Sequence, residues 1–235
     1  MQELLHGAKI FVLYLMPAAV IMLPARMFIK IPDELFRKIL HFVLLGAYIP
    51  FLFAFEHWYM SAAFAAMLIA IIFPILVLAG KIPAFSSFVN ERKKGEFKSS
   101  MVLALTTMVL SISICWGIFG DKLLVLACVY AWGVGDGLAA LVGKRFGKHK
   151  VNLPLADKRK SWEGTGAMFG CAVISVLMVL LVRGGLGFGT CLIVALCAAA
   201  VTSYVELCTK GGWDTITCPT AAMAVILPLV KILGA

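Results

Sequence analysis

The residue best suited to chemistry in this chain is a carboxylate inside an apolar segment. Asp136 lies between two glycines in a run of mostly small and aliphatic residues, and a basic cluster begins two helical turns later at Lys144. Ionisable side chains within hydrocarbon are costly and are normally kept for chemistry or transport. An acidic group followed by a cluster of cations is typical of a site that handles a metal ion and phosphate groups.

A second carboxylate shares this character. Of the twelve acidic residues, only Asp136 and Glu206 fall inside apolar stretches, while Glu163 and Asp214 lie in nearby connections. These four carboxylates can meet at one membrane depth. Mg²⁺ is typically held by one or two carboxylates together with substrate phosphates, so the pattern indicates a Mg²⁺–nucleotide site. The predicted metal ligands are Asp136, Glu206 and Asp214.

Cations and small residues surround the predicted acidic site. Asp136, Gly143 and Gly147 fall on one stripe of a helix, where the lack of bulky side chains lets another backbone or a phosphate approach. Basic side chains follow the same segment and are placed to clamp a triphosphate. They are Lys144, Arg145, Lys148 and Lys160.

Most of these signals also have a structural interpretation. Basic residues at helix ends often only enforce membrane topology or contact anionic lipid. Glu206 can instead pair with Lys210, and the pattern Gly166-x-x-x-Gly170 is typical of helix packing. Asp136 differs, because a buried carboxylate between glycines has no evident structural purpose, and for this residue we favour function.

The composition indicates a membrane protein. Hydrophobic residues make up 62% of the chain and charged residues 14%, which excludes an ordinary soluble globular protein. A helix needs about 20 apolar residues to span a bilayer, and eight stretches are long enough. They are Ile10–Ile29, Ile39–Phe55, Trp58–Gly80, Met101–Phe119, Leu123–Val142, Thr165–Val182, Phe188–Leu207 and Thr217–Leu233. We predict an all-α integral membrane protein with about eight transmembrane helices, one polytopic membrane domain over residues 1–235 and no sizeable soluble domain.

The net charge of +9 could indicate a nucleic-acid partner, but its distribution argues against one. Most basic residues lie on alternate connections between the predicted spans, which must share one side of the membrane. The positive-inside rule places these connections in the cytoplasm and both termini outside. The longest, 81–100 and 144–164, are expected to contribute to the active site. Because no basic segment precedes the first span, we interpret it as a retained helix rather than a signal peptide.

Several motifs together resemble a membrane superfamily that uses CTP. They are Gly135-Asp136-Gly137 through Gly147, Lys160-Ser161-Trp162-Glu163-Gly164, Arg37-Lys38-x-x-His41, Glu91-Arg92-Lys93, and Glu206 with Asp214-Thr215-Ile216-Thr217-Cys218-Pro219. This superfamily contains phosphatidate cytidylyltransferases and CTP-dependent kinases of dolichol, phytol, polyprenols or diacylglycerol. The chain looks more like the kinase branch, and the terminal signature of the cytidylyltransferase branch has no match in it. Asp214-Thr215 stands where the kinase branch often has Asp-Asn.

The resemblance implies a Mg²⁺-dependent kinase that transfers the γ-phosphoryl group of CTP, or of another nucleoside triphosphate, to the hydroxyl of a membrane lipid alcohol. Asp136 would be the catalytic residue, as a metal ligand or as a base that orients the hydroxyl. The implied nucleotide- and phosphate-binding residues are Arg37, Lys38, Arg92, Lys93, Gly143, Lys144, Lys148, Lys160 and Ser161. Chains this short are common among bacterial members, which implies the plasma membrane with an active site on its cytoplasmic face.

Two other functions stay open at this point. One is a phosphatidate cytidylyltransferase, which would release pyrophosphate from CTP. The other is an ion-coupled transporter or flippase that uses Asp136 and Glu206, although transporter sites tend to lie near the bilayer midplane in repeat-related helices and no internal repeat is visible. The sequence leaves open the lipid, the nucleotide base and the oligomeric state, a homo-oligomer included.

Overall fold

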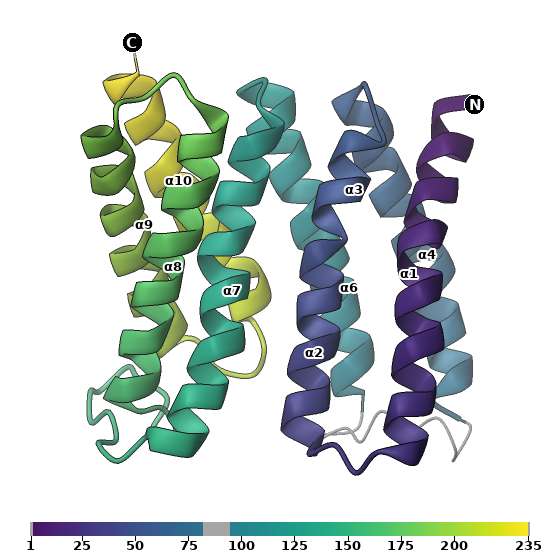
Figure 1. Ribbon diagram of the computed structural model, residues 1–235, viewed down its shortest axis with the longest axis horizontal. Helices are drawn as coiled ribbons and strands as arrows, with labels where there is room; N and C mark the ends of the chain where they lie inside the picture. The colour runs from purple at the N-terminus through teal and green to yellow at the C-terminus, as the bar shows by residue number, and fades with distance from the viewer. Residues whose placement is uncertain (1, 82–94, 235) are drawn as a thin grey trace. The chain divides into compact units, whose positions relative to one another are not determined.

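The computed structural model describes residues 2–81 and 95–234, and these residues are mostly helical (Figure 1). The elements are α1 (Gln2–Phe28), α2 (Asp33–Gly46), α3 (Tyr48–Phe53), α4 (Trp58–Ala79), α6 (Glu96–Ser111), the π-helix η1 (Ile112–Ile118), α7 (Lys122–Phe146), α8 (Trp162–Arg183), α9 (Phe188–Cys208) and α10 (Asp214–Leu233). Within the described ranges no strand forms, and Lys150 and Ser161 make an isolated bridge. The prediction of an all-α protein is confirmed.

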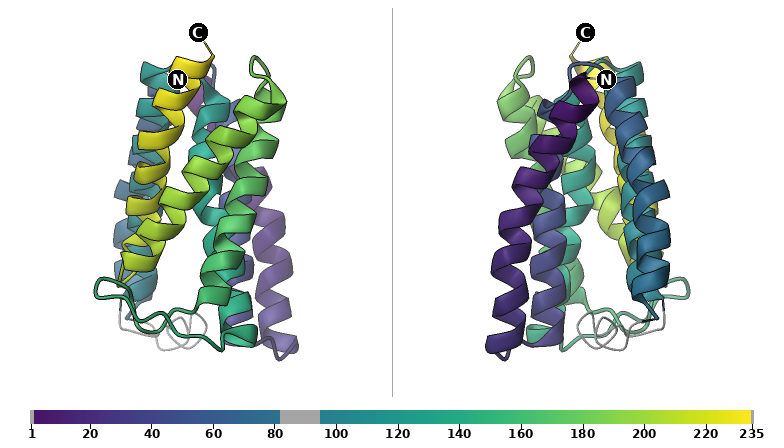
Figure 2. Two further views of the ribbon diagram at one scale, coloured as in Figure 1. Left: turned by 90° about the vertical axis from the view of Figure 1, so that its left-hand side faces the viewer. Right: turned by 90° about the vertical axis from the view of Figure 1, so that its right-hand side faces the viewer.

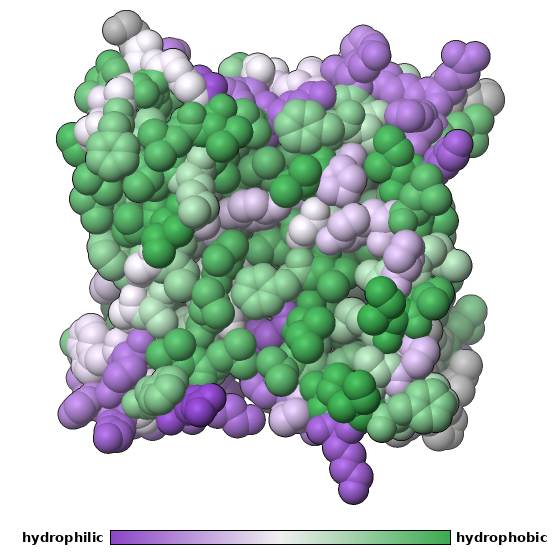
Figure 3. Space-filling view, in the orientation of Figure 1, coloured by the Kyte–Doolittle hydropathy of each residue, from purple (hydrophilic) through white to green (hydrophobic). Residues whose placement is uncertain are grey.

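The number of predicted spans is also confirmed. Eight helices in the described part of the chain are long and apolar enough to cross a membrane. α2 and α3 together form one of them, and α6 continues into η1 to form another. Apolar side chains cover much of the face seen in Figure 3, and polar side chains gather mainly toward its upper and lower edges. This distribution suits contact with the hydrocarbon core of a bilayer.

Several helices are longer than the apolar stretches that predicted them. Two of these, α7 and α8, extend toward each other, so the connection expected at 144–164 spans only 147–161. Ser161 accounts for the early start of α8, because its side chain accepts a hydrogen bond from the Gly164 N–H and caps the helix. Lys144 therefore lies in the last turn of α7, where a cation interacts favourably with the helix dipole.

The chain forms two compact units, residues 1–113 and 114–235, and each is described by itself. In the first unit, α1 packs against α3 and α4, and α4 packs against α6. Its core is an aromatic cluster in which the rings of Phe11, Phe51 and Phe64 lie 5.7 to 6.2 Å apart. A single domain over the whole chain stays a prediction.

In the second unit, α7 packs against α8, α9 and α10, while α9 packs against both α8 and α10. Met168 of α8 lies against Gly135 of α7, where a Cβ atom would be only 2.9 Å from the Met168 Cγ. The close α7–α8 contact therefore depends on a residue without a side chain. We call the end where α7 and α9 finish and α8 and α10 begin the site end of this unit; it lies toward the bottom of Figure 1.

Candidate functional site

Small residues at the site end let α7 and α8 meet closely. A Cβ atom on Gly143 would lie 3.3 Å from the Ser161 hydroxyl and 3.5 Å from the Cα of Gly164. On Gly147 it would lie 2.5 Å from the same hydroxyl. The predicted stripe of small residues thus receives a neighbouring backbone, and helix packing explains the contacts of Gly143 and Ser161. Phosphate binding by these two residues stays a prediction.

The connection between α7 and α8 is folded onto the end of α9. The Asp157 N–H donates to the Leu207 carbonyl at 3.1 Å, and the Val151 N–H donates to the Lys160 carbonyl at 3.1 Å. Val151, Ala156 and Leu207 form a small buried apolar cluster. These contacts anchor the backbone around Lys160 beside the last turn of α9.

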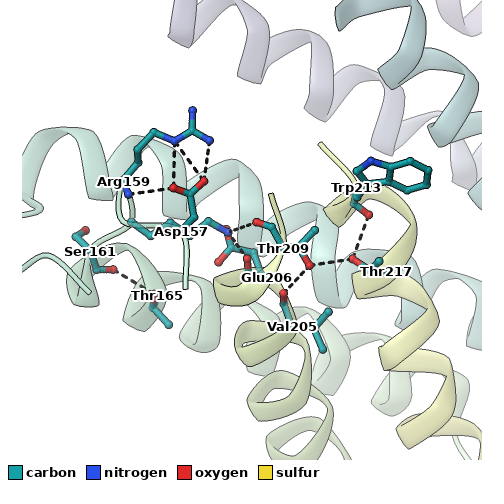
Figure 4. A network of polar contacts seen from close by, with 10 residues as sticks. Asp157, Arg159, Ser161, Thr165, Val205, Glu206, Thr209, Trp213 and Thr217 are labelled. Carbon is teal, nitrogen blue, oxygen red and sulfur yellow. Dashed lines mark hydrogen bonds and ion pairs between the residues drawn. The ribbon is translucent and has the colours of Figure 1, made fainter. Parts of the chain in front are cut away.

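The Lys160 ammonium group contacts the end of α9. Its partners there, Glu206 and Thr209, are labelled in Figure 4. Its Nζ lies 2.7 Å from Oε1 of Glu206 and also donates to the backbone carbonyls of Glu206 and Thr209. An ammonium group has three N–H donors, so these acceptors match its full capacity. A lysine beside the last carbonyls of a helix also interacts favourably with the helix dipole. Lys160 therefore supports Glu206 and α9 in this structure, and its contact with phosphate stays a prediction.

Three carboxylates from three helices come together at the site end. Glu206 of α9 is only 8% exposed. Its charge interacts with those of Asp136 on α7 and Asp214 at the start of α10, both of which are half-buried. The structure therefore brings the three predicted metal ligands into one neighbourhood. Like charges repel one another, and the Lys160 ammonium offsets part of that cost at Glu206.

An apolar cluster adjoins these carboxylates. Trp132 lies one helical turn before Asp136 on α7, and Cys218 lies one turn after Asp214 on α10. Together with Met168 of α8 these residues form a buried cluster. The carboxylates thus lie at the edge of an apolar core, where a lower local dielectric strengthens their interactions with cations.

Two other acidic residues of this region have basic partners of their own. Glu163 lies 2.7 Å from Nδ1 of His149 and accepts a hydrogen bond from the His149 N–H, a pairing that the sequence did not indicate. Asp157 lies 2.7 Å from Nη2 of Arg159, and this guanidinium lowers the pKa of the Asp157 carboxyl to about 2. Both pairs stabilise the connection between α7 and α8.

Three further cations of the predicted clamp lie at the site end. Lys144 and Arg145 are in the last turn of α7, and Lys148 follows at the start of the connection. All three side chains are exposed, so an anion in the aqueous phase can reach them. Their position suits contact with nucleotide phosphates and equally with anionic headgroups.

The remaining predicted phosphate-binding residues are not in the second unit. Arg37, in the first unit, pairs with Glu34 at 2.5 Å and with Glu96 at 3.6 Å. Lys38 is buried in α2 of the same unit. Their binding of phosphate stays a prediction. Two predicted residues lie outside the described ranges, and these are Arg92 and Lys93.

The three carboxylates do not form a complete metal site by themselves. Within residues 2–81 and 95–234, no three His, Cys, Asp or Glu side chains form a group that could hold a metal ion. A Mg²⁺ ion that arrives with a nucleotide needs only one or two protein carboxylates, because phosphates and water supply the other ligands. Carboxylate oxygens are the donors that Mg²⁺ prefers, so one or two of Asp136, Glu206 and Asp214 suit an ion that arrives with a nucleotide.

Sequence reasoning missed two residues that organise this site. The Asp157 N–H donates to α9, and the Thr209 hydroxyl lies 3.2 Å from that of Thr217 across the turn between α9 and α10. Asp157 carries no signal in the sequence beyond being a polar residue in a loop. The position of Thr209 between Glu206 and Asp214 is the one feature that could have drawn notice to it.

Comparison with known proteins identifies the family. No family model matches the chain, and no solved structure matches it. The chain is 32% identical over 197 residues to a phytol kinase of Synechocystis sp. (strain ATCC 27184 / PCC 6803 / Kazusa), an alignment that covers 80% of this chain and 76% of that protein. It is 29% identical over 148 residues to a probable chloroplastic phytol kinase of Triticum aestivum, which covers 59% of this chain and 47% of the relative. The chain therefore belongs to the phytol kinase family and is a phosphotransferase.

Proposed function

We propose that this chain phosphorylates the hydroxyl group of a membrane lipid alcohol of the phytol type, with CTP as the phosphoryl donor. Both relatives are named for phytol, and one alignment extends over most of both chains. The observation that carries the proposal is the meeting of Asp136, Glu206 and Asp214, with Lys160 paired to Glu206, at one end of the second unit. Phosphoryl transfer depends mainly on positioning and charge stabilisation, which such a group can supply.

Asp136 is the proposed catalytic residue. It is half-buried on α7 beside the buried apolar cluster of Trp132, Met168 and Cys218, so a lipid hydroxyl brought to the site end would meet its carboxylate at the edge of an apolar region. The Asp136 carboxylate orients this hydroxyl and accepts its proton. The hydroxyl oxygen then bonds to the γ-phosphorus as the bond to the β-phosphate oxygen breaks, which leaves a lipid phosphate and CDP.

Glu206 and Asp214 are the proposed supports for Mg²⁺, with Asp136 as a third oxygen donor at hand. When bound, the ion would neutralise charge that develops on the transferred phosphates. Lys160 fixes the Glu206 carboxylate through its direct ion pair. The exposed lysines at the end of α7 offer ammonium groups to the nucleotide phosphates.

The site end of the second unit is the proposed cytoplasmic end, in the plasma membrane of a bacterium with both chain termini outside. Seven Lys and Arg residues lie in the segment from Lys144 through Lys160, both included, and the excess of Lys and Arg on alternate connections supports this orientation. A cytoplasmic site would receive the nucleotide from water and the lipid alcohol sideways from the bilayer.

The deciding experiment follows the label of the nucleotide. Purified protein in vesicles is incubated with γ-labelled CTP or ATP, Mg²⁺ and one of phytol, a polyprenol or diacylglycerol, and lipid is then separated from water. We expect label in the lipid fraction, with phytol and CTP preferred. Label that appears only in aqueous pyrophosphate when phosphatidate is supplied would establish a cytidylyltransferase instead. No nucleotide consumption with any lipid would contradict both enzymatic readings.

A further inference from the structure

A groove of about 360 Å³ opens on the second unit between α8 and α9. This volume is in the range of about 300–1,000 Å³ that is usual for small-molecule sites. α8 and α9 are joined at the opposite end of the unit by a short turn and diverge toward the site end, as the left view of Figure 2 shows. Trp162, Phe169, Tyr204 and Leu207 give the groove a mainly apolar lining, and Gly166 leaves room in it.

The groove neighbours the candidate site along α9. Its α9 wall includes Ser203 and Leu207, which lie one turn before and directly after Glu206. Leu207 also packs against Val151 and Ala156 of the connection that carries Lys160. A chain lying in this groove would therefore have one end at the turn of α9 that holds the Glu206 carboxylate.

A buried hydroxyl in the groove lining has no partner within the described residues. Ser203 is 4% exposed, and its Oγ makes no hydrogen bond in that part of the chain. Buried polar groups are nearly always hydrogen-bonded, because water no longer satisfies them. The Oγ itself is enclosed, so a ligand hydroxyl in the groove would supply the missing hydrogen bond once the Ser203 side chain rotates toward it.

The mouth of the groove has the character of a membrane interface. Trp162 and Tyr204 line it and are about half exposed. Amphipathic aromatic rings are enriched where hydrocarbon meets the headgroup layer. This depth suits a molecule with one polar end and an apolar chain.

We propose that the α8–α9 groove binds the hydrocarbon chain of the lipid alcohol next to its hydroxyl end, and that the Ser203 hydroxyl hydrogen-bonds to the substrate hydroxyl. The inference rests on the proposed function for the identity of the occupant. The groove thereby becomes the specificity site for the lipid, while the carboxylates of α7, α9 and α10 act on its hydroxyl.

Gly166 and Gly170 provide a matched pair of variants. A Cβ atom on either glycine meets nothing within 4 Å, so the Cβ of a leucine fits at both positions. Only Gly166 lines the groove. Gly166→Leu should raise the KM for phytol about tenfold, the scale of losing one well-buried apolar contact, with the KM for CTP unchanged. Gly170→Leu should leave both KM values unchanged. Equal losses in both variants would indicate packing of this glycine face against another helix and would overturn the proposal.

Ser203→Ala gives a second test that separates binding from structure. Removing the Ser203 hydroxyl breaks no hydrogen bond within the described residues, so thermal stability should be unchanged or higher in Ser203→Ala. The same result is expected for the control Ser61→Ala, whose hydroxyl is also buried without a partner in the described residues. Only Ser203→Ala should raise the KM for phytol. A phytol KM equal to that of the wild type would overturn the role of Ser203.

Photolabelling tests the groove without requiring turnover. A phytol analogue with a diazirine near its hydroxyl, irradiated with the protein in phosphatidylcholine vesicles, should label residues 162–169 and 200–207. Excess phytol should remove the label, whereas excess phosphatidylcholine should not. If excess phytol removes the label but the protein phosphorylates no alcohol, the proposed function would be refuted and the groove would still be a binding site for the lipid alcohol. Labelling elsewhere, or labelling displaced equally by phosphatidylcholine, would overturn the proposal.

Discussion

The two ends of the second unit treat charged residues differently. At the end where α7 begins, Asp121 caps that helix through the Leu123 N–H and pairs with Arg183 of α8 at 2.5 Å. At the site end, Glu206 pairs with Lys160 and also interacts with the charges of Asp136 and Asp214. At the end where α7 begins, one carboxylate caps a helix and pairs with a cation. At the site end, three carboxylates lie in one neighbourhood although their charges repel one another.

This difference separates stabilising charges from functional ones. The Asp121 carboxylate satisfies a helix terminus and joins two helices, which is a sufficient structural reason for its presence. Neighbouring carboxylates destabilise the folded state through mutual repulsion. Their presence at the site end therefore indicates a function in the folded protein. Substitutions at the site end should therefore affect activity, whereas substitutions at the opposite end should affect stability.

The largest effect is expected from Asp136→Asn. This change removes the proposed base and metal ligand, and we expect turnover to fall by about 1,000-fold. Thermal stability in detergent should be unchanged or higher, because one source of repulsion at Glu206 is gone. Lipid phosphorylation and thermal unfolding are measured on the same preparation. A wild-type rate would refute the catalytic assignment of Asp136.

Lys160→Ala should affect both properties. It leaves Glu206 buried without its cation, which we expect to lower stability by about 2–3 kcal/mol, less than for a fully buried pair because Lys160 is 22% exposed. The uncompensated charge should also raise the nucleotide KM by repelling phosphates. Lys158→Ala, an exposed lysine of the same connection, is the control and should change neither. Lower stability with an unchanged KM would limit Lys160 to a structural role.

Apolar run length predicted the helices because a spanning segment must satisfy its backbone internally, which leaves little choice of secondary structure. The sequence predicted that four carboxylates, Asp136, Glu163, Glu206 and Asp214, can meet at one membrane depth. Three of them lie in one neighbourhood because α7, α9 and α10 pack together, whereas Glu163 pairs with His149. The membrane depth of these carboxylates and their roles stay predictions.

Side-chain partners were not readable, because they depend on how a connection folds. Lys160 contacts α9 only because Asp157 and Val151 fix the backbone around it. The start of α8 was placed too late because the cap formed by Ser161 is polar and adds nothing to an apolar run. The groove beside Ser203 could not be foreseen either, since it arises from the divergence of two helices and not from any motif.

Arg183→Ala tests the opposite end. It removes the partner of Asp121 but leaves the hydrogen bond of that carboxylate to the Leu123 N–H. We expect a loss of about 1 kcal/mol in stability, as for a partly exposed pair, with lipid phosphorylation unchanged when assayed below the unfolding temperature. If activity falls by more than the loss of folded protein explains, the proposal that charges at this end serve stability alone would be contradicted.

The smallest effect is expected from acid on the connection between α7 and α8. Arg159 lowers the pKa of Asp157 to about 2, whereas an unfolded aspartate titrates near about 3.9. A lowered folded-state pKa stabilises the connection fully above the unfolded value, and this contribution is lost as pH falls from about 4 toward 2. Hydrogen exchange of the Asp157 N–H, which donates to the Leu207 carbonyl, should therefore accelerate over that interval, beyond the intrinsic change measured on an unfolded peptide. The gain should be modest, because the Arg159 side chain is 74% exposed and solvent screens the pair.

In Asp157→Asn the acceleration should disappear, since no carboxylate remains there to titrate. Its persistence would assign the acid sensitivity to Glu163 and His149 instead.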